Sequence, residues 1–165
     1  MKLSRNNKTT ITFRVNETER VLFTQILQQY LLVPAAHYKL SRSPQTPGGA
    51  EAQQLLDEAH AEARISHAQQ LADWLKAKNR FRRTQTGFTL TVPRSDTEWL
   101  LQVLNDVRIG NWLLLGSPEE RVQPEELDPQ LRRLWAAMEL SGVFQLALLQ
   151  ALDRKSTRLN SSHRT

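Results

Sequence analysis

Apolar and polar residues alternate strictly in two short stretches of the chain. Residues 9–15 place isoleucine, phenylalanine and valine on one face and polar side chains on the other, as in a strand buried on one side. Residues 88–92 alternate in the same way, and the basic stretch 80–85 precedes them across Thr86-Gly87. The pattern predicts two strands, with 80–85 as the hairpin partner of the second.

Helical periodicity covers most of the remaining chain. Apolar residues recur at spacings of three and four in segments that begin near Glu17, Glu51, Asp96 and Pro129. The second of these segments is rich in alanine and holds no Gly or Pro up to its end near Asn79. The sequence thus predicts a mainly α fold: one compact helical domain of about four main helices with two or three short β-strands.

The helices should share one core. Their apolar stripes match in width, and we expect Trp99, Leu104, Leu134 and Met138 to lie inside this core. The domain implied by these stripes extends over residues 1–152.

Two of the predicted helices begin with the same capping sequence. Asn16 stands three residues before Glu19, and Ser95 stands three before Glu98, which is the spacing of a capping box. Each box follows a predicted strand, so strand, cap and amphipathic helix occur twice. The recurrence indicates either a pseudo-repeat whose strands pair or two independent uses of a common cap.

The last residues differ from the rest. Residues 153–163 read like the in-frame translation of a sequencing adapter, joined abruptly to a leucine-rich helix that ends at Leu152. We therefore expect 153–165 to be a non-native, disordered tail that replaces a truncated natural C-terminus.

Charge and composition narrow the function classes. The chain carries a net charge of +5, but residues 153–165 hold four Lys or Arg and one Asp, which leaves 18 basic and 16 acidic side chains and a net charge of +2. A nearly neutral body gives no electrostatic indication of nucleic-acid binding. The absence of cysteine excludes disulfides and thiolate chemistry, and no apolar run approaches the ~20 residues that span a bilayer. We expect a cytoplasmic protein.

The segment Trp99–Arg108, with the sequence WLLQVLNDVR, carries a family resemblance. With one residue more between Leu100 and Leu104, it resembles the W-L-x-x-L-N-D-x-R signature of an uncharacterised bacterial helical family whose genes often lie beside that of ClpS, the adaptor of the Clp protease. The likeness is specific over about a dozen residues, and this chain departs from the signature at Ile109-Gly110. The resemblance implies a protein partner, ClpS or a Clp protease, without implying a mechanism.

Asn105, Asp106 and Arg108 lie in the middle of a predicted helix, where Asn and Asp have poor helix propensity. One interpretation is a hydrogen-bonded network that fixes how this helix packs. The other is a polar binding patch for a partner or a small anion, in which Arg108 binds and Asp106 orients it.

A second candidate is the basic run at the end of the long helix, made up of Lys76, Lys78, Arg80, Arg82 and Arg83. Basic residues suit a helix C-terminus through the macrodipole. Alternatively, the hairpin is the wing of a winged helix that contacts nucleic-acid phosphates.

Motifs of catalysis are missing from the sequence. It has no Gly-rich phosphate loop, no nucleophile elbow and no paired carboxylates in an apolar setting. His60 and His67 share a helix face with Asp57, but a single Asp-x-x-His fits a solvated charged face better than a metal site. We expect no enzyme activity, no metal and no cofactor. The favoured function is a protein-interaction or regulatory module linked to Clp-type proteolysis, and the alternative is a nucleic-acid-binding regulator.

Overall fold

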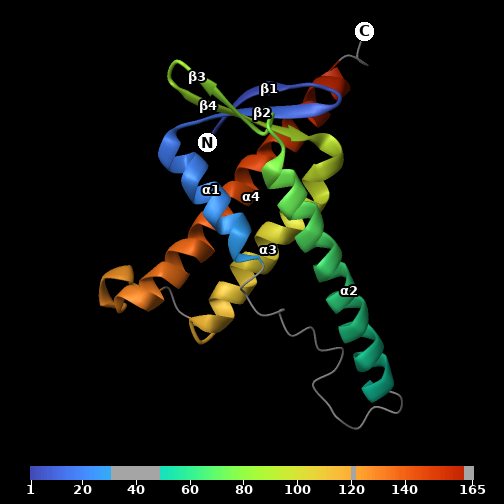
Figure 1. Cartoon of the computed structure of the whole chain (residues 1–165), viewed down its shortest axis with the longest axis vertical. Helices are drawn as coiled ribbons and strands as arrows, with labels where there is room; N and C mark the ends of the chain where they lie inside the picture. The colour runs from blue at the N-terminus through green and yellow to red at the C-terminus, as the bar shows by residue number, and fades with distance from the viewer. Residues whose placement is uncertain (31–48, 120–121, 162–165) are drawn as a thin grey trace.

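A four-stranded antiparallel sheet lies at one end of the molecule, and the helices lie on one side of it (Figure 1). The computed structural model describes residues 1–30, 49–119 and 122–161. The strands are β1 (Lys2–Asn6), β2 (Thr10–Val15), β3 (Phe81–Thr84) and β4 (Gly87–Pro93), in the order β1-β2-β4-β3. The helices are α1 (Glu17–Gln29), α2 (Gly49–Lys76), α3 (Thr97–Leu114) and α4 (Pro129–Ser161), and short 3-10 turns cover Arg94–Asp96 and Pro124–Glu126. The mainly α prediction is confirmed in outline.

The two predicted strands form the centre of the sheet. β2 pairs antiparallel with β4, with Thr12 opposite Thr91, and β3 is the predicted hairpin partner of β4. Two hairpin-plus-helix units, β1-β2-α1 and β3-β4-α3, therefore meet along β2 and β4. The pairing that the sequence suggested for the two strands is present.

The fourth strand, β1, corrects the expectation of two or three strands. Its pairing with β2 shifts register between Leu3 and Arg5, so Ser4 is the extra residue of a bulge. A bulge breaks the two-residue period by which strands are recognised, and this hides β1 in the sequence.

The first predicted capping box is present and the second is not. The Glu19 amide donates to Asn16 Oδ1 at 2.8 Å, and the Asn16 amide donates to Glu19 Oε2 at 2.9 Å. Before α3 the chain forms a 3-10 turn, and the Asp96 side chain makes no cap hydrogen bond. Its Oδ2 instead accepts from Trp74 Nε1 at 3.0 Å and from Arg80 at 3.3 Å. Tertiary contacts of Asp96 replace the predicted local cap.

The core lies between the sheet and helices α1, α3 and α4. Phe23 of α1 stands at its centre, with its ring 4.9 Å from that of Phe144 and 6.4 Å from those of Trp74 and Phe81. Four elements distant in sequence thus meet at one aromatic side chain, which was not among the residues that the periodicity singled out.

The predicted core residues divide into two groups. Trp99 and Leu104 are buried as expected, whereas Leu134 and Met138 are only half-buried, because the first turns of α4 extend beyond the core. α2 reaches the core through Leu71 and Trp74 near its C-terminal end, and Arg64 and His67 contact Tyr30 at the end of α1. The N-terminal part of α2 runs away from the other elements (Figure 1).

The described part of α4 extends to Ser161, past the end near Leu152 that the sequence predicts. Residues 162–165 lie outside the described residues, as do the side chains from Arg154 onward.

Candidate functional site

Helices α3 and α4 pack along each other and form the framework of the site. α3 buries one face, which includes Leu100, Val103, Leu104 and Val107. Gln145 of α4 crosses to α3 and donates a hydrogen bond from Nε2 to the carbonyl oxygen of Leu101 at 3.2 Å. This contact holds the outer sides of the two helices in a fixed relation.

A groove of about 510 Å³ runs between the outer sides of these two helices. Its lining residues are Asn105 and Arg108 of α3, and Met138, Glu139, Gly142, Val143, Gln145, Leu146 and Leu149 of α4. The volume lies within the ~300–1,000 Å³ that ligand sites commonly have. Two of the three residues singled out in the Trp99–Arg108 segment therefore line one hollow.

Apolar side chains on α4 are unusually exposed along this groove. Val143 is 56% exposed, Leu146 55% and Leu149 46%. They are spaced by three residues and so form a stripe on one helix face. The protein leaves this stripe uncovered while burying Phe144 and Leu148 between its members.

The Arg108 side chain reaches across the groove to α4 at a glycine. A Cβ atom placed on Gly142 would lie 3.7 Å from Arg108 Nε and 4.0 Å from its Cζ. The absence of a side chain at Gly142 thus leaves room for the guanidinium group between the helices. Arg108 itself is exposed, so it borders the apolar stripe with its charge in solvent.

Asp106 is not brought together with Arg108. It is half-buried and is not among the residues that line the groove. Side chains two positions apart on a helix point to different sides, whereas Asn105 and Arg108, three apart, share one. The structure joins Asn105 with Arg108 and places Asp106 elsewhere on α3.

The basic run at the end of α2 is divided among four environments. Arg80 is held by Asp96, lies with its Cζ 4.5 Å over the Trp74 ring, and donates to the Trp74 carbonyl oxygen. Burial lowers the pKa of Arg80, and the charge of Asp96 partly offsets this effect. Arg80 therefore has a structural role that joins α2 to the sheet.

The other four members of the run do not form one patch with it. Lys76 and Lys78 are exposed beside the end of α2, Arg82 lies on the outer face of the sheet, and Arg83 lies close enough to Glu17 to lower the pKa of that carboxyl group further. The main cause of that lowered pKa is the hydrogen bond from Arg20 to Glu17. Within the hairpin, β4 pairs with β2 at the centre of the sheet and β3 forms the edge.

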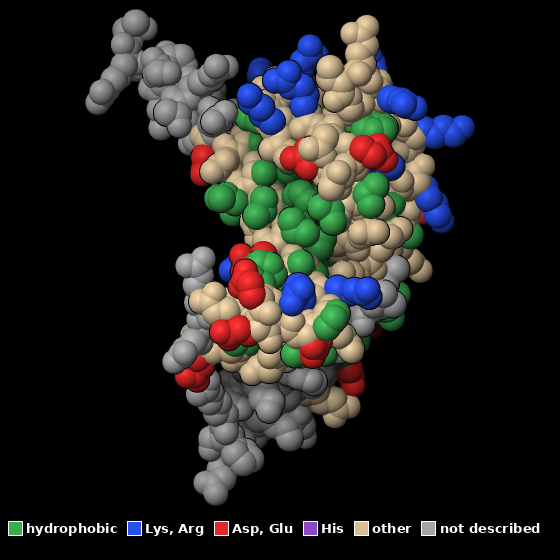
Figure 2. All heavy atoms as spheres, turned by 90° about the vertical axis from the view of Figure 1, so that its left-hand side faces the viewer, with side chains coloured by type: hydrophobic (Ala, Val, Ile, Leu, Met, Phe, Trp, Pro, Cys, Tyr) green, Lys and Arg blue, Asp and Glu red, His purple; other side chains and the backbone are tan. Residues whose placement is uncertain are grey.

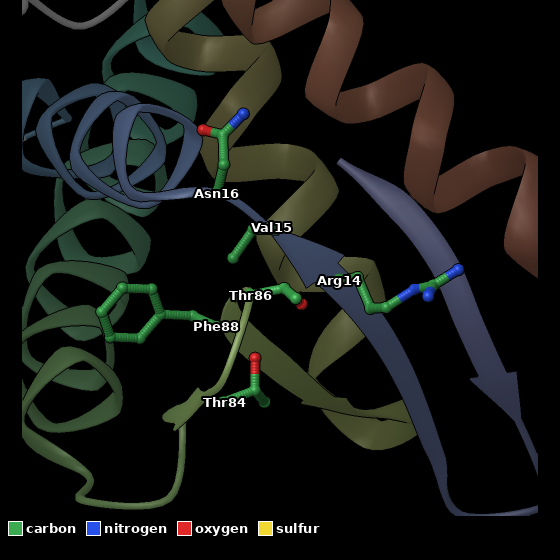
Figure 3. Close-up of a pocket in the computed structure, with 6 residues that line it drawn as sticks. All are labelled: Arg14, Val15, Asn16, Thr84, Thr86 and Phe88. Carbon is green, nitrogen blue, oxygen red and sulfur yellow. The ribbon is translucent and has the colours of Figure 1, made fainter.

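A second hollow, of about 220 Å³, lies where β2 ends beside the β3–β4 turn (Figure 3). Its lining residues are Arg14, Val15, Asn16, Thr84, Thr86 and Phe88. Gly87 brings the turn close to β2, since its φ is +142° and a Cβ there would lie 2.7 Å from the Val15 carbonyl oxygen. The hollow is smaller than the ~300 Å³ at which ligand sites begin.

Metal-ligating side chains are not clustered in the described part of the chain. Within that part, no group of three His, Asp or Glu residues could hold a metal ion. His67 Nδ1 lies 3.5 Å from the Tyr30 hydroxyl, and the side chains of Asp57 and His60 lie outside the described residues.

The length and apolar character of α4 also bear on the site. Of the described helices, α4 over Pro129–Asp153 is the one that length and composition would allow to cross a membrane. A core helix of a water-soluble protein passes the same test, and α4 supplies Phe144, Leu148 and Ala151 to the core.

Comparison of the chain with protein-family models, with curated proteins and with solved structures finds no match. The function therefore has to be argued from the groove and the surfaces themselves.

Proposed function

We propose that the chain is a protein-interaction module whose α3–α4 groove holds an amphipathic helix of a partner protein. The observation that carries this proposal is the exposed stripe of Val143, Leu146 and Leu149 beside Arg108. Isolated exposed apolar residues need no explanation, but a row of them along a groove is typical of an interaction site.

The shape of the groove favours a helix as the occupant. Two residues of α3 and seven of α4 line the groove, so a third helix that lies along α4 would contact both helices. The stripe from Val143 to Leu149 rises about 9 Å along α4, so two to three turns of a partner helix would cover it. Apolar residues at i, i+3 or i+4, and i+7 of that helix would contact the stripe.

The charges at the rim set the polarity of the partner. Arg108 stands on the α3 side, and Glu139 lies on α4 about one turn before Gly142. A partner helix with an acidic side chain toward Arg108 and a basic one toward Glu139 would match both. Such rim charges contribute mainly to orientation and association rate.

In this proposal the module lies in the cytoplasm and acts by binding rather than by catalysis. A link to Clp-type proteolysis rests on the resemblance of the segment Trp99–Arg108. In that segment the apolar residues are buried, while Asn105 and Arg108 reach the groove. ClpS or a Clp protease subunit is accordingly the first partner to test.

The experiment is a display selection of helical 15-residue peptides against the full chain. We expect selected peptides to carry an apolar i, i+3 or i+4, i+7 face with an acidic residue beside it. Their affinity should fall at least about tenfold for Leu146→Asp, which puts a charge into the groove. Leu55→Asp is the matched control, because Leu55 is 67% exposed on α2, away from the groove, and this change should leave the affinity unaltered.

Selected peptides that bind Leu146→Asp as well as the unaltered chain would refute the groove as the binding site. The partner is tested separately, by calorimetric titration with purified ClpS. Micromolar binding that Leu146→Asp abolishes supports the Clp link. Absence of heat at two temperatures, at protein concentrations of about 100 μM, rejects ClpS as the partner, because burial of apolar surface makes the heat of binding depend on temperature.

A further inference from the structure

The outer face of the sheet is a second surface, unrelated to the groove. Helices cover the other face only (Figure 1). Because successive residues of a strand point to opposite faces, β2 buries Ile11 and Phe13 and presents Thr12 and Arg14 outward. Figure 3 shows Arg14 and Val15 leaving β2 in different directions.

Cations line up across this face. Lys2 of β1 pairs with Arg14 of β2, Arg14 pairs with Thr89 of β4, and Thr89 pairs with Arg82 of β3. With strands ~4.8 Å apart, the backbone positions of the three basic residues fall within about 15 Å in one row. The neighbouring row adds Arg5, which pairs with Thr12.

The bulge in β1 is what brings Lys2 and Arg5 to the same face. Residues three apart in a regular strand point to opposite faces. The extra residue Ser4 shifts the register, so that Lys2 pairs with Arg14 and Arg5 with Thr12, both of which face outward. The bulge thereby places two cations of β1, Lys2 and Arg5, on the face that also holds Arg14 and Arg82.

The sequence around this sheet is basic throughout. Residues 1–15 and 78–93 together contain eight Lys or Arg and no Asp or Glu. In Figure 2 the Lys and Arg side chains gather at the sheet end of the molecule, and most of the visible Asp and Glu lie further from it. Like charges directly opposite each other, such as Lys2 and Arg14, destabilise a sheet. A bound anion would offset that cost.

The uncharged groups on this face indicate which anion. A hollow of about 440 Å³ is lined by Ser4, Arg5, Thr12, Asn79, Arg82, Thr89 and Thr91. Guanidinium, hydroxyl and amide groups are those that contact the phosphates and sugars of nucleic-acid duplexes. Proteins that bind single strands also stack bases on aromatic side chains. The outward positions of the four described strands hold none, since Phe13, Phe81 and Phe88 lie on the core side.

We propose that the outer face of the sheet binds the sugar-phosphate backbone of a nucleic-acid duplex, without reading its sequence. Lys2, Arg5, Arg14 and Arg82 make the charged contacts. This site differs from the predicted winged helix, because Arg5 and Arg14 come from the N-terminal hairpin and Arg80 is engaged by Asp96. The proposal does not depend on the groove having a partner.

The experiment measures fluorescence anisotropy of a labelled 20-base-pair DNA duplex of mixed sequence with the full chain. With about four phosphate contacts, the dissociation constant should weaken about 100-fold between 50 and 200 mM salt. The variant Arg5→Gln, Arg14→Gln, Arg82→Gln should bind at least about tenfold more weakly at 50 mM and reduce the salt slope by about 2 to 3. A control variant removes the same charge from the tail through Arg154→Gln, Lys155→Gln and Arg158→Gln. Its salt slope should lie within about 1 of the slope of the unaltered chain.

Four results would overturn the proposal: no duplex binding at 50 mM salt, equal losses for the sheet and tail variants, tighter binding of the single strand than of the duplex, or binding of anionic lipid vesicles in place of the duplex. Thermal unfolding of each variant checks that it is folded. If the triple sheet variant is unfolded, the single variant Arg14→Gln tests the proposal, and it should decrease the salt slope by about 1.

Discussion

Gly142 and Arg108 show how a single position shapes the groove. Glycine inside a helix costs stability relative to alanine because it loses more backbone entropy on folding. Here it lies under the Arg108 guanidinium group, where any long side chain would displace the arginine from α4. The sequence pointed to Arg108 because it lies beside Asn105 and Asp106, two poor helix formers in the middle of a predicted helix. It gave no indication of Gly142, because the contact depends on how α3 and α4 pack.

Gly142→Ala should stabilise the protein by about 0.5–1 kcal/mol. The new Cβ would lie 3.7 Å from Arg108 Nε, which is an ordinary van der Waals contact. The free energy of unfolding in urea measures the effect. A destabilisation of about 1 kcal/mol or more would show that the two helices are closer than described.

Glu19 gives the capping box a pH dependence. Partial burial acts to raise the pKa of its carboxyl group, but hydrogen bonds from the Met1 ammonium group and the Asn16 amide outweigh this and lower the pKa below 4.5. A lowered pKa in the folded state stabilises the protein above the unfolded-state pKa, and that contribution is lost as the pH falls through the folded-state value.

We therefore expect Glu19→Gln to cost most stability near neutral pH. The difference in unfolding free energy between the unaltered chain and this variant should shrink as the pH falls below ~4.5. Urea titrations between about pH 7 and pH 3 measure it. A difference that stays constant over this range would mean that the carboxylate charge plays no part in the cap.

At the scale of elements, periodicity identified every segment that buries a regular stripe and missed those set by tertiary contacts. The four helices and strands β2 and β4 follow from spacing alone, and β3 follows from its place before the Thr86-Gly87 turn. β1 was not predicted, because the bulge at Ser4 interrupts its alternation. The predicted cap of α3 was wrong, because the Asp96 side chain binds Trp74 and Arg80 instead. The stripe of α4 was predicted as core throughout, yet Leu148 is buried and Leu149 is 46% exposed.

Leu104→Ala should cost about 2–5 kcal/mol, because Leu104 is completely buried on α3 and its truncation leaves a cavity. Leu149→Ala on α4 is the matched control and should cost less than about 1 kcal/mol, since the side chain is already half in solvent. Denaturant titration compares the two. Similar losses for both variants would contradict the assignment of Leu149 to the groove.

The whole molecule presents two different surfaces on one core. The sheet end is open and basic, and the α3–α4 groove is apolar with one cation and one anion at its rim. Asn105 and Arg108 belong to the polar binding patch that the sequence offered as one interpretation, whereas the basic sheet face was not predicted. Its cations come from residues 1–15 and 78–93, and only the pairing of β2 with β4 brings these segments together.

Deleting residues 154–165 should leave the thermal midpoint within about 2 °C of the full chain, because the expected non-native tail follows the last core residue of α4. Ala151 is buried and its carbonyl oxygen accepts a hydrogen bond from Asn6. A deletion that begins at Leu148 removes the buried residues Leu148 and Ala151 and should lower the thermal midpoint clearly. A large loss from the shorter deletion would show that the tail belongs to the folded protein.

The most direct test of the groove as the partner site is a methyl NMR titration of the full chain with a peptide from the display selection. The account predicts chemical-shift changes concentrated at the methyl groups of Val143, Leu146 and Leu149, with those of Val21 and Leu55 unchanged, since both are exposed but lie outside the groove. Changes centred on Val21 or Leu55, with the α4 stripe unaffected, would contradict it.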